Sequence, residues 1–313
     1  MAVRRLGFLA AVTLAASLAG CDGGGSGGSG DAGPPSRPGP EVAVASFNFP
    51  ESRLLAEIYA QAMEHAGIPV RRELGLGPRE LVQPALQQGF VDFVPEYAGT
   101  ALAGLPGAAG VDATDIAAVR DALEQRYGEL GLRVLAPAEA ANQNGLVVTR
   151  ETAVRLPGGA TSDLAGVARD LAIGGPPECP VRPYCLLGLE RAYGLSFERF
   201  VPLDGEDRTR RALDDGVIDV GVMFTTDGTL AGGDYVLLDD DRRLQPADNV
   251  IPVVSGRVLD RYGSDLTTAV DAVSARLSTA ALRFLNWRVT AAGKDAAAEA
   301  RAWLRRHGLT APP

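Results

Sequence analysis

Few side chains in this sequence are suited to acid–base or nucleophilic catalysis. The 313 residues include three cysteines and two histidines, His65 and His307, both in helical patterns where we expect surface or boundary positions. A serine or cysteine nucleophile needs a neighbouring base, which is usually a histidine. The same shortage argues against histidine-based zinc or iron chemistry. We therefore expect no metal site and no cofactor in this chain.

Carboxylates remain as candidate catalytic groups, because glycoside hydrolysis needs only two acids. Glu96 and Asp227 are one such pair, but the chain has 39 acidic residues and no spacing singles out two of them. The sequence thus favours a binding protein over an enzyme. A carboxylate-dependent exported hydrolase is the alternative from a different class.

Composition and charge exclude two further classes. With 46% hydrophobic and 22% charged residues, the chain is too apolar for disorder and has room for one large or two medium domains. Its net charge of −9 repels phosphate backbones, so we expect no nucleic-acid partner.

The first forty residues indicate export. A short basic start, Met1–Arg5, precedes an apolar run, Leu6–Leu18, that is too short to cross a bilayer but suits a signal peptide. The run ends in Leu-Ala-Gly before Cys21, which is similar to the lipobox of bacterial lipoproteins. We expect residues 1–20 to be a signal peptide and Cys21 to be acylated on the outer face of the cytoplasmic membrane. A plain signal peptide with an incidental cysteine is the alternative.

An exported location guides the interpretation of two further sequence features. Residues 21–40 are rich in Gly, Ser and Pro and have few side chains to bury, so we expect a flexible tether. Cys179 and Cys185 are close in sequence, and in an exported protein such a pair favours a disulfide. A metal site at these cysteines is the alternative, but no histidine or third cysteine is available for it.

From Glu41 onward, short apolar runs alternate with helical patterns, which indicates an α/β architecture. Two such series, a return strand and C-terminal helices suggest two lobes, and a cleft between such lobes is the default ligand site. The expected strands are 42–45, 70–74, 91–94, 133–135, 146–149, 219–223, 235–238 and 250–254. The expected helices are 50–66, 78–88, 112–130, 162–169 and 208–215, with an almost entirely helical tail over 264–308.

Several motifs in this folded part resemble those of one family. They are residues 44–52 (VASFNFPES), 74–77 (LGLG), 91–102 (VDFVPEYAGTAL), 222–228 (VMFTTDG) and 249–254 (NVIPVV). In this order they resemble the substrate-binding lipoproteins of ABC transporters for glycine betaine, carnitine and choline. The PEYxGT segment is fairly specific, and the resemblance covers about residues 41–310.

The resemblance implies a two-lobed type II periplasmic-binding-protein fold with the ligand cleft between the lobes. Residues 41–137 plus 249–313 would form lobe I and residues 138–248 lobe II, with hinges near Pro137 and Pro246. The expected partner is an ABC permease. The chain itself would need no cofactor, because ATP is used by other transporter subunits.

The resemblance also implies a quaternary-amine ligand. Such a cation has no hydrogen-bond donor, so selectivity depends on aromatic faces around its methyl groups, each worth roughly 0.5–2 kcal/mol. Tyr97 and Phe224 would supply two faces, and polar contacts would come from side chains near them. The candidate ligand-binding residues are Ser46, Asn48, Tyr97, Thr100, Asn144, Phe224, Thr225 and Asp248.

Three positions depart from the family pattern, namely Ser52, Gly145 and Asp248. Ser52 stands where a glutamine is common, Gly145 where an aromatic is common, and Asp248 at the tyrosine of a common Pro-Pro-Tyr-Asn motif. With two aromatics missing, a four-walled cage would be reduced to about two walls. A free Asp248 would favour a net cation such as choline over a zwitterion, unless it caps a turn before the hinge. A different small polar solute on the same fold is the first alternative, and a sensor domain with a membrane partner is another.

Overall fold

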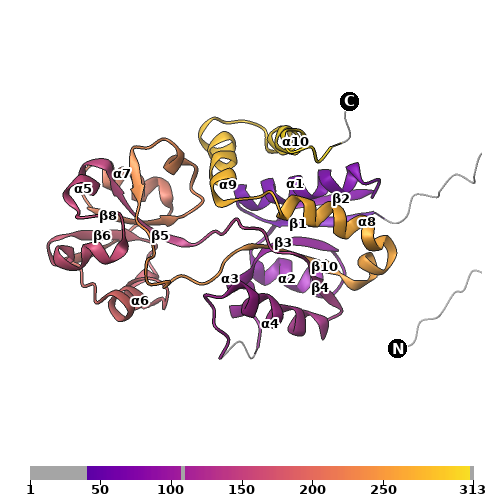
Figure 1. Cartoon of the computed structure of the whole chain (residues 1–313), viewed down its shortest axis with the longest axis horizontal. Helices are drawn as coiled ribbons and strands as arrows, with labels where there is room; N and C mark the ends of the chain where they lie inside the picture. Colours follow the sequence, from indigo (N-terminus) through magenta and orange to yellow (C-terminus); the bar gives the residue numbers. More distant parts are fainter. Residues whose placement is uncertain (1–40, 107–109, 311–313) are drawn as a thin grey trace, which may run out of the picture. The chain divides into compact units, whose positions relative to one another are not determined.

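A computed structural model describes residues 41–106 and 110–310 (Figure 1). The predicted signal peptide, Cys21 and the tether lie outside the described residues. In the part that is described, no helix combines the length and the apolar character needed to cross a membrane.

The first sheet takes strands from both ends of the folded chain, in the order β2-β1-β3-β10-β4. β1 runs parallel to β2 and β3, whereas β10 runs antiparallel to β3 and β4. Every residue of β1 and β10 is buried, because both strands lie inside the sheet under helices. The strands are β1 Val42–Phe47, β2 Val70–Gly77, β3 Phe93–Tyr97, β4 Leu132–Val134 and β10 Val250–Ser255.

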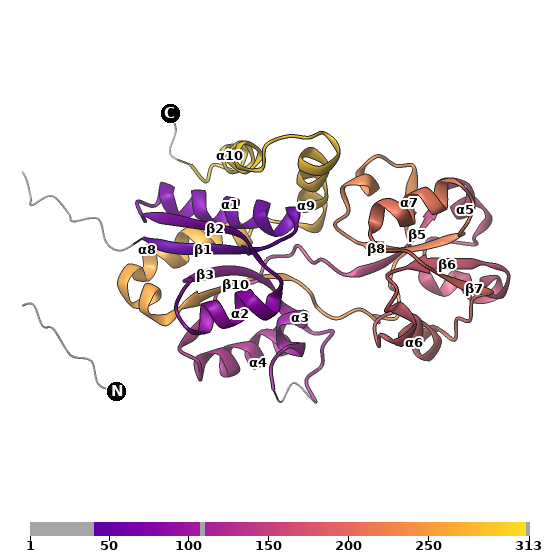
Figure 2. The same cartoon turned by 180° about the vertical axis from the view of Figure 1, so that it is seen from behind.

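Helices cover both faces of this sheet, with α1 and α10 on one side and α2 and α4 on the other (Figures 1 and 2). α1 buries an apolar face that includes Leu54, Leu55 and Ile58. The helices are α1 Pro50–His65, α2 Arg79–Gln87, α3 Ala98–Ala103, α4 Ile116–Gly128, α8 Gly256–Ser274, α9 Thr279–Asn286 and α10 Ala296–Arg306, with the π-helical turn η6 Trp287–Ala291 after α9. We call this sheet and its helices lobe I.

The second sheet has the order β7-β6-β8-β5-β9 and is formed by the middle of the chain. β6 is parallel to β7 and β8, whereas β5 is antiparallel to β8 and β9. Its strands are β5 Asn144–Thr149, β6 Ala172–Gly175, β7 Arg199–Pro202, β8 Val220–Phe224 and β9 Tyr235–Leu237. Its main helices are α5 Arg150–Arg155, α6 Leu186–Gly188 and α7 Glu206–Asp214. We call this sheet and its helices lobe II.

Two chain segments connect the lobes and lie side by side. The Ala138 N–H donates to Val250 O (2.8 Å), and the Asn142 N–H donates to Asp248 O (3.0 Å). An isolated bridge also pairs Ala141 with Asn249. The two-lobed α/β architecture expected from the sequence is thus confirmed, with two five-stranded sheets joined by paired connections.

Two of the expected helices differ in the structure. Residues 162–169 form two short 3₁₀ segments, η1 Thr161–Gly166 and η2 Ala168–Asp170, instead of an α-helix. Val167 separates them, and the Asp163 carboxylate accepts the Ala160 N–H (2.9 Å), which fixes a tight turn. Helix α4 also begins four residues later than expected, because Asp115 caps its N-terminus by accepting the Ala117 N–H.

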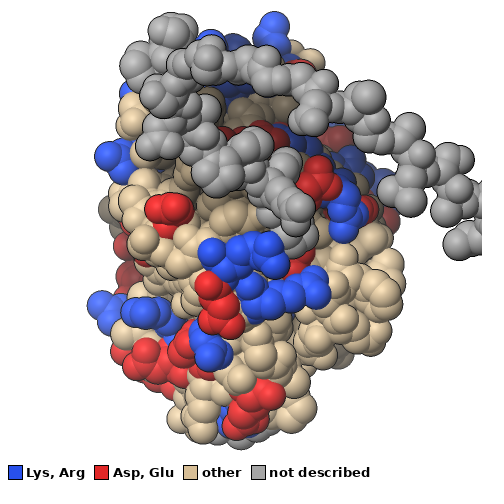
Figure 3. Space-filling model, turned by 90° about the vertical axis from the view of Figure 1, so that its right-hand side faces the viewer, with Lys and Arg blue, Asp and Glu red and all other residues tan. Residues whose placement is uncertain are grey.

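Acidic and basic side chains alternate over the end of lobe I that Figure 3 presents. Several basic side chains lie together near the centre of the visible face, with acidic side chains beside them.

Candidate ligand-binding cavity

A large cavity of about 1070 Å³ takes its walls from both lobes. Lobe I contributes the carboxyl ends of β1 and β3 and the starts of α1, α2 and α3. Lobe II contributes the end of β8, the residues that follow it and the start of α7. Ligands of open α/β sheets bind at the carboxyl ends of strands, so this cavity is in the expected place.

Aromatic side chains line the cavity from both lobes. The rings of Phe47 and Phe49 stack with centroids 5.9 Å apart, and the Phe49 and Tyr97 centroids are 6.0 Å apart. Phe224 faces the same cavity from lobe II and is 47% exposed, whereas Tyr97 is 6% exposed. The rings of lobe I are therefore packed in place, and the ring of lobe II is open to solvent.

Glu51, in the first turn of α1, is held by three hydrogen bonds in the wall of lobe I. Its Oε1 accepts from the Tyr97 hydroxyl (2.6 Å) and from Asn142 Nδ2 (2.8 Å). Its Oε2 accepts from Asn286 Nδ2 (2.5 Å). Burial and the neighbouring Glu51 carboxylate raise the pKa of Tyr97 well above its ordinary value, so the phenol stays protonated and donates.

Both carboxylate oxygens of Asp248 accept hydrogen bonds at the start of α3. Its two oxygens accept from the Thr100 N–H and the Thr100 hydroxyl, each at 2.6 Å. Gly99 makes this approach possible, since a Cβ there would lie 2.9 Å from Pro246 Cβ. Asp248 thus caps a helix and joins the returning connection to lobe I.

Arg79, at the start of α2, is paired within lobe I. Its guanidinium lies 3.0 Å from the Glu96 carboxylate and 5.1 Å from the centre of the Phe47 ring. Burial raises the pKa of Glu96 to about 7, against the opposing effect of Arg79. Glu96 is 2% exposed and does not line the cavity, so it is not placed to act with Asp227 on a bound molecule.

Four acidic residues line the side formed by lobe II, and two of them, Glu206 and Asp227, accept backbone N–H groups there. Asp227 accepts the N–H and the hydroxyl of Thr229, and Glu206 accepts the Phe224 N–H (3.0 Å). Burial and the charge of Asp227 raise the pKa of Glu206 to about 8. Glu206 is therefore mostly neutral at pH 7.

The structure brings five of the eight candidate ligand-binding residues to this cavity. These are Asn48, Tyr97, Thr100, Phe224 and Asp248. Ser46 lies outside it in β1, where its hydroxyl donates to Phe47 O and accepts the Gly75 N–H. Asn144 and Thr225 line a separate cavity.

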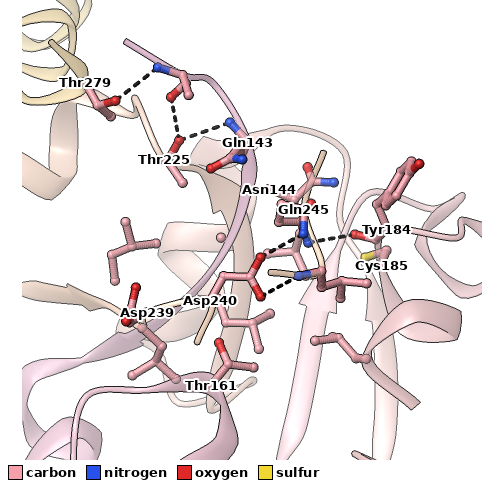
Figure 4. Close-up of a pocket in the computed structure, with 18 of the residues that line it drawn as sticks. Gln143, Asn144, Thr161, Tyr184, Cys185, Thr225, Asp239, Asp240, Gln245 and Thr279 are labelled. Carbon is pink, nitrogen blue, oxygen red and sulfur yellow. Dashed lines mark hydrogen bonds between the residues drawn. The ribbon is translucent and has the colours of Figure 1, made fainter. Parts of the chain in front are cut away.

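That second cavity has a volume of about 300 Å³ and lies beside the connections, with most of its lining from lobe II and with Thr279 and Arg283 of α9 from lobe I (Figure 4). Thr225 bridges its upper part, because its hydroxyl accepts the Gln143 N–H and donates to Ala141 O. Neighbouring residues therefore face different cavities, with Asn142 lining the large one and Gln143 the small one.

Packing explains two of the three departures from the family pattern. A Cβ at Gly145 would collide with the end of the Leu237 side chain, so a ring there requires Leu237 to move. The buried Ser52 hydroxyl accepts the Phe47 N–H (2.9 Å) and ties the end of β1 to α1. Both positions serve the packing of this chain.

Sequence reasoning missed Phe49, Glu51 and Glu206 as cavity residues. A signal existed for the first two, since Phe49 and Glu51 lie between a buried strand and the first turn of a helix. Nothing in the sequence marks Glu206, because its place depends on how lobe II folds. In the described ranges no cluster of His, Cys, Asp and Glu is arranged to hold a metal ion.

Comparison with known proteins agrees with this geometry. The family described as "Substrate binding domain of ABC-type glycine betaine transport system" matches residues 40–306. The glycine-betaine-binding protein of Pseudomonas aeruginosa is 30% identical over 286 residues, which cover 86% of this chain and 88% of that protein. The glycine betaine-binding protein YehZ of Escherichia coli is 28% identical, with 86% and 91% covered.

A solved structure shares the fold. The crystal structure of a glycine betaine/carnitine/choline ABC transporter protein superposes with a TM-score of 0.78 at 24% sequence identity. The match covers 86% of this chain and 99% of the other.

Proposed function

Because the chain belongs to the family of substrate-binding domains of ABC-type glycine betaine transport systems, we propose that it captures a small quaternary ammonium solute outside the cytoplasm and passes it to an ABC permease. Choline and glycine betaine are the first candidates. The sequence relatives carry names that refer to glycine betaine and carnitine.

One observation carries the choice of ligand class, namely aromatic rings from both lobes around a single cavity. A quaternary ammonium group cannot donate a hydrogen bond, and its positive charge is attracted to aromatic faces within about 6 Å. Phe49 and Tyr97 offer neighbouring faces from lobe I, and Phe224 offers one from lobe II. The Arg79 guanidinium already packs against the Phe47 ring. Phe49, Tyr97 and Phe224 are therefore the three rings that remain for the ligand.

Capture requires the lobes to close, and the paired connections are suited to this motion. Lobe I would comprise residues 41–137 plus 249–313, and lobe II residues 138–248. The hinges near Pro137 and Pro246 would absorb the rotation, since a few residues at element ends suffice for domain closure. The ordered wall of lobe I would bind the solute first, and Phe224 would then cover it.

The proposed location is the outer face of the cytoplasmic membrane. The lipobox before Cys21 would provide a lipid anchor, and residues 21–40 would let the binding domain reach the permease. The Cys179–Cys185 disulfide, with Cα atoms 5.3 Å apart, suits an oxidising compartment.

A thermal-shift screen of the purified full-length chain tests the ligand class. The panel is choline, glycine betaine and carnitine against amino acids and sugars. A ligand at 100 times its dissociation constant adds about 2.7 kcal/mol to stability, which raises the melting temperature of a chain this size by several degrees. We expect such a shift with quaternary amines alone. A shift only with another solute class would replace the proposal with the alternative of a different polar ligand.

A further inference from the structure

We propose that Glu51 supplies the negative charge that faces the ammonium group of the ligand. This assignment rests on the proposed function, because it presumes that a quaternary ammonium solute enters the large cavity. Glu51 lines that cavity and is 6% exposed.

Glu51 differs from the other buried glutamates of the described residues in having no cationic partner. Glu57 pairs with Arg72 at 2.9 Å, and Glu96 pairs with Arg79 at 3.0 Å. Glu299 pairs with Arg288 at 2.7 Å. Glu51 forms no ion pair within the described part of the chain, although it is buried to a similar degree.

The three hydrogen bonds to Glu51 satisfy its oxygens without neutralising its charge. Their donors are the Tyr97 hydroxyl and the side-chain amides of Asn142 and Asn286, all of them neutral. A buried carboxylate is costly unless it is both hydrogen-bonded and paired with a cation. The first requirement is met by the protein, and a bound cation would meet the second.

The position of Glu51 matches that of the aromatic faces. The hydroxyl of Tyr97 donates to its carboxylate, and the ring of Tyr97 lies beside that of Phe49. A trimethylammonium group placed against these rings is therefore also close to the carboxylate. Aromatic faces and a full negative charge act together on the same cation.

The other charged groups at the cavity are less suited to this role. Asp248 and Asp227 each hold a backbone turn by accepting an N–H, from Thr100 and Thr229 respectively. The charge of Arg79 also acts on Asp248, and Arg283 is close enough to Asp227 to interact with it. The positive charge of Arg79 is opposed by Glu96. Arg210 is paired with Asp207 at 2.7 Å, and Asp204, Glu206, Arg208 and Arg211 line the cavity from the opposite lobe.

The test compares choline with 3,3-dimethylbutan-1-ol, which has the same shape but carries carbon in place of the charged nitrogen. Isothermal titration of the full-length chain measures both affinities for the wild type and for Glu51→Gln. We expect the wild type to prefer choline by about a hundredfold, and Glu51→Gln to reduce this preference by about tenfold or more. The ratio of choline to glycine betaine affinity should also fall, because the lost charge repels a ligand carboxylate.

Glu57→Gln is the matched control, since Glu57 is also a buried glutamate of α1 but does not line the cavity. It should leave the preference for choline over its neutral analogue unchanged. Glu51→Asp retains the charge and should keep most of that preference. A purely structural role for Glu51 would lower both affinities equally in Glu51→Gln, and this result would overturn the assignment.

If Glu51→Gln fails to fold, the preference of the wild type for choline over its neutral analogue still tests the assignment of Glu51. A preference for choline below about tenfold would mean that no full charge faces the ammonium group. Failure of the proposed function looks different, because then neither choline nor any other quaternary amine binds the wild type.

Discussion

The aromatic side chains on the two walls of the large cavity differ in how firmly they are held. On the wall of lobe I, the Tyr97 hydroxyl donates to Glu51, which also accepts from Asn142 in the connection, through hydrogen bonds of 2.6–2.8 Å. The Tyr97 ring is 6% exposed. On the wall of lobe II, Phe224 is 47% exposed and no ring contact holds its side chain among the described residues.

This difference suggests a division of labour between the lobes. A preorganised wall loses little conformational entropy when a ligand binds, so it supplies most of the affinity. An exposed ring gains contacts only when the lobes close, so it reports on closure. Substitutions on the two walls should therefore differ in their effect on binding, with the largest loss on the wall of lobe I.

Replacement of Tyr97 should weaken binding most. Tyr97→Ala removes an aromatic face and one donor to Glu51, and we expect at least about a tenfold loss of choline affinity in isothermal titration. Tyr97→Phe keeps the ring and should lose less. Equal losses for the two variants would assign the effect to the hydroxyl and contradict a role for the ring.

Replacement of Phe224 should have a smaller effect. Phe224→Ala removes the face from lobe II, and we expect affinity to fall by about three- to tenfold. Phe284 is a matched control, because it is 45% exposed but does not line the cavity. A loss for Phe284→Ala as large as that for Phe224→Ala would remove the argument that lobe II closes over the ligand.

Affinity should rise with pH through the titration of Glu206. Its pKa of about 8, raised by burial and Asp227, leaves it mostly neutral at pH 7 and ionised at pH 9. The added negative charge on the wall of lobe II should strengthen choline binding by about threefold. Titration of Glu206→Gln at both pH values is the check, and an unchanged rise in that variant would assign the effect to another group.

Removal of the disulfide should affect stability but hardly affinity. Cys179 is buried in the core of lobe II, and Cys185 lines the small cavity instead of the large one. Cys179→Ser should lower the free energy of unfolding by about 2 kcal/mol in urea titrations. Choline affinity should stay within about twofold, so a tenfold loss would show that the small cavity is coupled to the binding wall.

Much of the fold was predictable from the sequence because the signals are local. The buried strands β1 and β10 are continuous apolar runs, and α1 has a clear apolar face behind Pro50. The four-residue strands β6 and β7 were missed, since Gly174 and Gly175 at the end of β6 give no strand pattern. Their pairing depends on contacts with β8, which no local pattern reveals.

The site was predictable only in part. Tyr97, Thr100 and Phe224 could be named from motifs, because each follows or ends an apolar strand. Asn144 and Thr225 were named with them but line the small cavity. Adjacent residues of an extended segment point to opposite sides, so the motif gives the position along the chain but not the cavity that a side chain faces.

A crystal structure of the full-length chain grown with choline tests the central claim most directly. The account predicts the trimethylammonium group in the large cavity, within about 6 Å of the Tyr97 and Phe224 ring centroids and next to the Glu51 carboxylate. Choline in the small cavity beside the connections, or a large cavity that holds no choline at saturating concentration, would contradict it.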